Sequence, residues 1–190
     1  MAVSASSRRL YELVLAAVLI AVGIIIPTFS PFKIILEPAS FTLASHVAIF
    51  LAMFISPPVA VAVALGTTIG FFMGGFPIVI VIRAASHLVF ALVGALALQR
   101  KPSLLDGVKP MLAFSILVAL LHAVCEVLAV IPFYFGQGLS AGFYNRGFLV
   151  SVIVLVGVGT VVHSMVDFAI AVAVWKPLRK AVRWPVAAAR

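Results

Sequence analysis

Long apolar runs, separated by short segments rich in proline, glycine and basic residues, constrain this chain more than any other feature. A helix needs about 17–25 mostly apolar residues to cross a bilayer, and several runs approach or reach that length. Hydrophobic residues make up 65% of the sequence and charged residues 9%, whereas soluble domains have roughly half and a quarter. We therefore expect an all-α integral membrane protein that forms a single domain over residues 1–190.

Six transmembrane helices follow from the limits of these runs. Pro57 and Pro58 divide the long run that begins at Phe41, because a proline nitrogen cannot donate a helical hydrogen bond. Two loops, 28–40 and 132–147, are long enough to act as lids, and a basic tail covers 176–190. The predicted spans are 10–26, 41–56, 59–73, 78–98, 111–131 and 148–175.

Most basic residues fall on one side of the predicted spans. Cytoplasmic loops of membrane proteins carry an excess of Lys and Arg. With the amino terminus inside, only Lys33 and Arg146 lie outside, and Arg83 lies within a span. This ten-to-two bias predicts that both termini are cytoplasmic, and since it accounts for the net charge of +8 we expect no nucleic-acid partner. The basic residues on the cytoplasmic side are Arg8, Arg9, Arg100, Lys101, Lys109, Lys176, Arg179, Lys180, Arg183 and Arg190.

Common signatures of ATPases, metalloproteases and esterases are absent from the sequence. It contains no G-x-x-x-x-G-K-[ST], no H-E-x-x-H and no G-x-S-x-G, the motifs that carry those chemistries. We therefore expect no catalytic residues and no cofactor. A pocket in such a chain belongs to a facilitator or to a subunit that takes energy from partners.

Ionisable residues within the predicted spans mark the candidate site. Each costs roughly 2.5–3.5 kcal/mol to insert, so such residues usually serve a site or an internal pair. They form three pairs with a spacing of four, which places both members on one helical face. The pairs are Arg83 with His87, His122 with Glu126, and His163 with Asp167, and His46 lies near the outer edge.

Depth within the membrane separates these residues into two groups. His46, Arg83, His87, His122 and Glu126 lie toward the exterior and are expected to line one outward-facing pocket, whereas His163 and Asp167 lie deeper and are expected to pair structurally. An arginine fork suits a carboxylate or phosphate; alternatively, Arg83 and Glu126 only neutralise each other. The predicted substrate-binding residues are Arg83, His46, His87, His122 and Glu126, with Tyr144 and Asn145 from the outer loop.

Two further patterns bear on metals and on helix packing. Three histidines with Glu126 can ligate a transition metal, but the positive charge of Arg83 opposes a cation, so no metal site is expected. Ala17-x-x-x-Ala21 and Gly66-x-x-x-Gly70-x-x-x-Gly74 let helices approach closely. The glycines are expected to pack within the domain, and the alanines to face a partner subunit.

The chain resembles the substrate-binding S components of energy-coupling factor (ECF) vitamin transporters in its size, six spans and long first outer loop. Ala17-x-x-x-Ala21 stands where that family carries an A-x-x-x-A docking surface. Pro38-Ala39-Ser40-Phe41-Thr42-Leu43-Ala44-Ser45-His46 and Ile49-Phe50-Leu51-Ala52-Met53-Phe54-Ile55-Ser56-Pro57 resemble the niacin-specific members. The resemblance implies a plasma-membrane protein, without enzyme activity, that captures a vitamin outside and topples against a transmembrane coupling (T) subunit driven by two cytoplasmic ATPases.

The same resemblance assigns roles to parts of the chain. Pro31–Ser40 would form the lid, and the outer halves of the fourth to sixth helices would line the pocket. Nicotinate would place its carboxylate on Arg83 and its pyridine nitrogen on a histidine or Asn145, beside Tyr or Phe rings. A cation such as thiamine would use Glu126 instead.

Three other functions stay open at this point. One is an S component for another small vitamin or precursor. A membrane-embedded enzyme would use His122 and Glu126 as an acid–base pair and would turn over substrate alone. A stand-alone proton-coupled carrier would relay protons through His163 and Asp167 and would work in vesicles without any ATPase.

Overall fold

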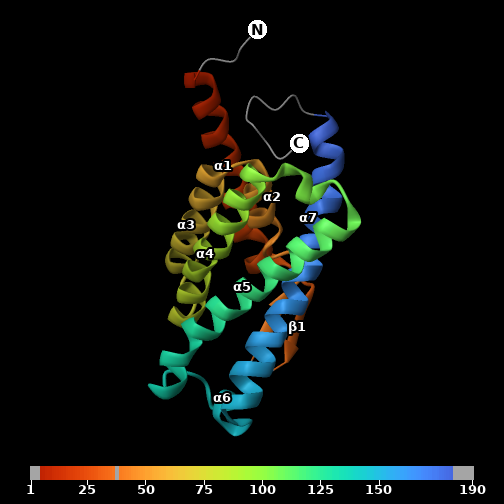
Figure 1. Ribbon diagram of the computed structural model, residues 1–190. Helices are drawn as coiled ribbons and strands as arrows, with labels where there is room; N and C mark the ends of the chain where they lie inside the picture. Colours follow the sequence, from red (N-terminus) through yellow and green to blue (C-terminus); the bar gives the residue numbers. More distant parts are fainter. Residues whose placement is uncertain (1–4, 37–38, 182–190) are drawn as a thin grey trace.

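Helices make up nearly the whole architecture of the computed structural model, which describes residues 5–36 and 39–181. The start of α1 and the end of α7 lie at one end of the bundle, and α6 lies at the opposite end (Figure 1). The elements are α1 (Ala5–Phe29), β1 (Lys33–Leu36), β2 (Ala39–Thr42), α2 (Val47–Ile55), α3 (Pro57–Met73), α4 (Ile78–Arg100), η1 (Pro102–Leu105), α5 (Val108–Phe135), α6 (Ala141–Asn145), η2 (Leu149–Val158, a π-helix) and α7 (Gly159–Ala181).

Within the described residues, four helices are long and apolar enough to cross a membrane: α1, α4, α5 and the continuous η2–α7 helix. The shorter α3 is also apolar. These helices confirm the predicted all-α membrane class. α4 begins at Ile78, as predicted, and ends two residues later than predicted, at Arg100. The predicted break at Pro57–Pro58 is confirmed too, because the extended Ser56 separates α2 from α3 and its Oγ accepts a hydrogen bond from the Val59 N–H.

The predicted second span, 41–56, is wrong at its start. Helix α2 begins only at Val47 and has 9 residues, which at 1.5 Å per residue is about 13 Å, less than half of the bilayer's hydrocarbon core. The preceding residues form the end of β2 and a turn. Every residue of α2 is buried, so this short helix is the central element of the bundle.

The two predicted outer loops contain regular structure. Between the described ends of α1 and α2, strands β1 and β2 form an antiparallel hairpin, from Lys33 opposite Thr42 to Leu36 opposite Ala39. Residues 37–38 of the predicted lid, and 182–190 of the predicted tail, lie outside the described residues. The predicted loop 132–147 is largely helical, because α5 continues to Phe135 and α6 follows at Ala141.

An aromatic core fills the half of the bundle nearer the start of α1 and the end of α7. Phe50 packs against Phe168 with ring centroids 5.3 Å apart, and Phe54 packs against Trp175 at 5.9 Å. These four side chains are buried. Aromatic side chains therefore fill this end of the bundle, and the cluster of histidines lies beyond it.

Helices α1 and α3 pack closely along glycines. A side chain added at Gly66 would collide with Ile20, and one added at Gly70 would collide with Ile24. The predicted packing of these two glycines within the domain is confirmed. Gly74, by contrast, faces its own turn and Phe76.

Candidate substrate-binding site

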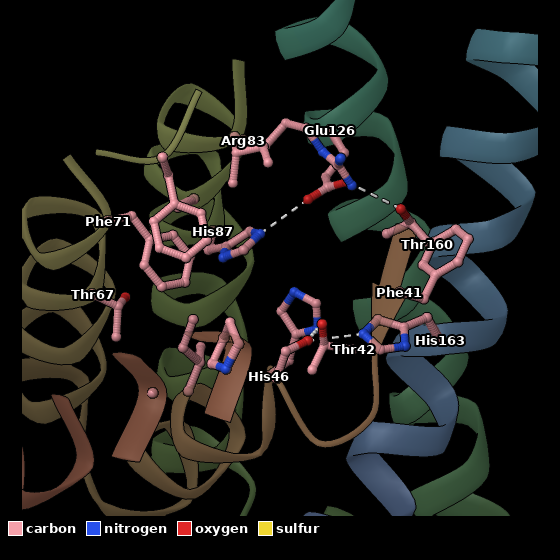
Figure 2. Close-up of a pocket in the computed structure, with 17 residues that line it drawn as sticks. Phe41, Thr42, His46, Thr67, Phe71, Arg83, His87, Glu126, Thr160 and His163 are labelled. Atoms are coloured by element: carbon pink, nitrogen blue, oxygen red, sulfur yellow. Dashed lines mark hydrogen bonds and ion pairs between the residues drawn. The ribbon is translucent and has the colours of Figure 1, made fainter. Parts of the chain in front are cut away.

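A cavity of about 160 Å³ lies beyond the aromatic core, between α1, α3, α4, α5, α7 and the hairpin (Figure 2). Apolar residues line it on two sides: Phe71 lies on the α3 side, and Phe41 lies across the cavity on the α7 side, with its ring centroid 5.4 Å from that of His163 (Figure 2). The polar lining consists of Thr42, Ser45, His46, Thr67, Arg83, His87, Glu126, Thr160 and His163.

An ion pair between α4 and α5 forms the charged part of the wall. Arg83 donates from both Nε and Nη2 to Glu126 Oε2, with an Nε–Oε2 distance of 2.8 Å. Thr160 also donates to Oε2, at 3.1 Å. Glu126 is almost completely buried, whereas the Arg83 side chain is 20% exposed. Both residues line the cavity, and Arg83 is the more exposed of the two.

His87 and His122 lie beside the other oxygen of Glu126, and His46 packs against both of these histidines. His87 Nε2 lies 3.1 Å from Glu126 Oε1, and His122 Nε2 lies 3.6 Å from the same oxygen. The His46 ring packs edge-on against both, with centroids 4.9 and 4.8 Å away. Donor atoms of these four residues all lie within 4.8 Å of one another.

The turn before α2 places His46 among these groups. Asp167 on α7 accepts the backbone N–H of Ala44 through Oδ1 and that of His46 through Oδ2, both at 2.8 Å. Its Oδ2 also lies 3.1 Å from His46 Nδ1. Asp167 is fully buried. Polar backbone at membrane depth needs such partners inside the protein, so this carboxylate holds the irregular turn in place.

His163 pairs with Asp167 as predicted, with Nε2 3.3 Å from Oδ2, but its place at the cavity contradicts the predicted division by depth. It lines the cavity, its ring centroid lies 5.0 Å from that of His46, and its Nε2 lies 3.0 Å from Ser45 Oγ. The prediction measured depth along straight spans and placed His46 near the outer edge. In the structure the hairpin carries residues 42–46 inward to meet α7 (Figure 2), so His163 joins the cavity group.

The other predicted site residues take three different positions. Arg83, His46, His87 and Glu126 line the cavity, and His122 lies directly behind it. Tyr144 and Asn145 belong to α6 and do not line this cavity; the Tyr144 hydroxyl hydrogen-bonds to the Phe133 carbonyl and the Leu139 N–H instead. Ala17 and Ala21 are exposed on the outer face of α1. Roles in binding or docking remain predictions for all of them.

The polar face of the last helix is a sequence signal that would have placed Thr160 and His163 at the cavity. Thr160, His163, Ser164 and Asp167 follow the i, i+3, i+4, i+7 spacing, which puts them on one side of a helix. Treating His163 and Asp167 as an isolated pair overlooked that four-residue stripe. The contacts of Phe41, Phe71 and Thr67 with the cavity have no comparable sequence signal.

Comparison with known proteins finds a transporter of similar sequence. The chain is 41% identical over 176 residues to the niacin transporter NiaX of Lactococcus lactis subsp. cremoris (strain MG1363), and the match spans 91% of this chain and 77% of that protein. No family model and no solved structure matches the chain. With its membrane-length helices, the chain is a multi-pass transport protein of the plasma membrane. It belongs to the family of that niacin transporter, the substrate-binding S components of ECF vitamin transporters.

Proposed function

We propose that this chain captures niacin, as the anion nicotinate, outside the cell for an ATP-driven ECF importer. The observation that carries the proposal is an arginine at the edge of a ring-sized cavity. An engineered protein cavity of about 150 Å³ accommodates benzene, and this one, with about 160 Å³, is below the range of about 300–1,000 Å³ typical for larger ligands. A single-ring vitamin fits these dimensions.

The lining groups suit an aromatic carboxylate. Guanidinium has five N–H donors; Arg83 uses Nε and Nη2 on Glu126, and no hydrogen bond from Nη1 is found among the described residues. Nη1 is therefore available for the nicotinate carboxylate. Phe41 and Phe71 supply apolar faces for the pyridine ring, and His46, His87 or His163 can hydrogen-bond its nitrogen.

The orientation in the membrane and the number of passages are part of the same proposal. We place both termini in the cytoplasm, because most basic residues of the described chain gather where α1 begins, α4 ends, α5 begins and α7 ends. Six passages result if the hairpin and α2 together form the second. The cavity then lies toward the exterior, and the aromatic core separates it from the cytoplasm.

Energy for import would come from partners, a transmembrane T subunit and two cytoplasmic ATPases. The α1 face with Ala17 and Ala21 is exposed and has the small residues that allow close helix contact. We propose that it docks on the T subunit when the loaded chain topples.

Analysis of the small molecule bound to the purified, detergent-solubilised chain tests the proposed function. Mass spectrometry should find niacin, and equilibrium dialysis should show that added nicotinate binds at least tenfold more tightly than the uncharged nicotinamide. A different co-purifying vitamin, together with no saturable nicotinate binding, would contradict the proposal. Uptake by the chain alone in vesicles, abolished by a protonophore, would favour a proton-coupled carrier.

A further inference from the structure

Four metal-binding side chains converge beside the cavity. His46, His87, His122 and Glu126 come from the turn before α2, from α4 and from α5, and offer donor atoms within 4.8 Å of one another. Imidazole with one carboxylate is typical of zinc and neighbouring transition metals rather than of Mg²⁺ or Ca²⁺. We propose that these four residues bind one divalent transition-metal ion of the zinc class.

Distances within the group agree with this assignment. Tetrahedral zinc with bonds of about 2.0–2.1 Å places its donor atoms roughly 3.3 Å apart. Glu126 Oε1 lies 3.1 Å from His87 Nε2 and 3.6 Å from His122 Nε2. His122 Nε2 is buried and has no hydrogen-bond partner among the described residues, which is costly for a polar atom. A metal ion at this point gives that nitrogen a partner.

The surrounding contacts are those that orient metal ligands. A ligating histidine usually binds a carboxylate, carbonyl or water through its second nitrogen, and a ligating carboxylate is itself hydrogen-bonded. His46 Nδ1 lies 3.1 Å from Asp167 Oδ2, and His122 Nδ1 lies 3.2 Å from Ser164 Oγ. His46 and His122 thus each keep Nε2 for the metal. Arg83 contacts Glu126 through Oε2 only, which leaves Oε1 to the histidines and to a metal ion.

Charge balance connects the ion with the anionic vitamin, and this step rests on the proposed function. With neutral histidines, Glu126 and Asp167 outweigh Arg83 by one negative charge, and a bound carboxylate adds a second. A buried excess of charge is unfavourable unless it is paired. A divalent cation brings the loaded site to neutrality.

Metal analysis of the tag-free, full-length chain tests the proposal. After chelator treatment and addition of Zn²⁺ or Co²⁺, elemental analysis should find about one ion per chain, with the visible absorption of tetrahedral Co²⁺. His122→Gln and His87→Gln should each weaken Co²⁺ binding by at least tenfold, whereas Cys125→Ser, beside Glu126, should leave it unchanged. Nicotinate should bind at least tenfold more tightly to the Zn²⁺-loaded chain.

Two results would overturn the inference in whole or in part. One is less than a tenth of an equivalent of Zn²⁺ or Co²⁺ bound at micromolar concentration by the correctly folded wild-type chain. The other, which overturns the charge-balance step alone, is nicotinate binding that is equally tight without metal, with protons taken up in place of the ion; that result leaves the proposed function intact. Stoichiometric Co²⁺ binding without nicotinate binding would support the metal site and contradict the proposed function.

Discussion

Asp167 shows how one buried residue determines the shape of the cavity. Ala44 has a φ of 65°, a left-handed conformation that costs a non-glycine residue about 1–3 kcal/mol. The two backbone N–H groups held by the carboxylate, those of Ala44 and His46, offset that strain. The position of His46 therefore depends on a side chain more than a hundred residues later in the chain.

Replacing Asp167 by Asn should destabilise the protein and weaken nicotinate binding. An amide keeps the volume but has only one accepting oxygen, so a buried N–H loses its partner, at a cost of about 1–3 kcal/mol. Thermal unfolding in detergent should shift down by several degrees, and equilibrium dialysis should show a higher Kd. Asp106→Asn is the matched control: its ion pair with Arg179 is exposed, and such pairs contribute about 0–1 kcal/mol. Equal effects of the two substitutions would contradict the role given to Asp167.

Single residues near the cavity were predictable from the sequence where their insertion into a bilayer is costly. Arg83, His87 and Glu126 are conspicuous because ionisable groups are costly in a bilayer, and the structure brings them together. The place of His163 at the cavity was not predictable, because the inward path of residues 42–46 depends on long-range contacts with Asp167. Spacing along one helix carries no information about such contacts.

At the scale of elements, the close contact between α1 and α3 depends on glycines, which have no side chain. Gly70→Val should lower the free energy of unfolding by about 1–3 kcal/mol, since its methyl groups would overlap Ile24 and overpacking has that cost. Thermal unfolding of the detergent-solubilised chain measures the effect. Ala113→Val on the exposed face of α5 is the matched small-to-large control and should change little. A Gly70→Val protein as stable as wild type would show that α1 and α3 are not tightly packed here.

Helix positions were predictable from the sequence, but the hairpin was not. Apolar runs and Pro57–Pro58 locate α3, α4 and α5 because those helices must satisfy their own backbone groups in lipid. The hairpin and the short α2 lie within the bundle, where partners from other elements replace helical hydrogen bonds. An apolar run such as 41–56 has the same sequence pattern whether it crosses the lipid as one helix or lies within the bundle.

At the scale of the whole molecule, one face of α1 is exposed in the part of the chain that the structure describes. Only 11% of its apolar window is buried, and Ala17 and Ala21 lie on the exposed side. Ala17→Leu with Ala21→Leu should leave nicotinate binding unchanged and reduce ATP-driven uptake at least tenfold, because bulky residues prevent close approach of the T subunit. Uptake by proteoliposomes that contain the T subunit and both ATPases measures the effect.

A second pair of exposed alanines provides the control for that experiment. Ala169 and Ala173 on α7 have the same spacing and are also exposed. Their double replacement by Leu should leave uptake near the wild-type rate. Full uptake with the α1 variant, or loss of uptake with the α7 variant instead, would place the docking face elsewhere.

The most direct test of the proposed site compares two ligands with two proteins. Equilibrium dialysis gives Kd for nicotinate and nicotinamide, with the wild-type chain and with Arg83→Gln/Glu126→Gln, whose neutral pair leaves no unpaired buried charge. If Arg83 binds the carboxylate, the wild-type preference for nicotinate is at least tenfold, about 1.4 kcal/mol, and falls close to onefold in the variant. An unchanged preference in the folded variant would contradict the account.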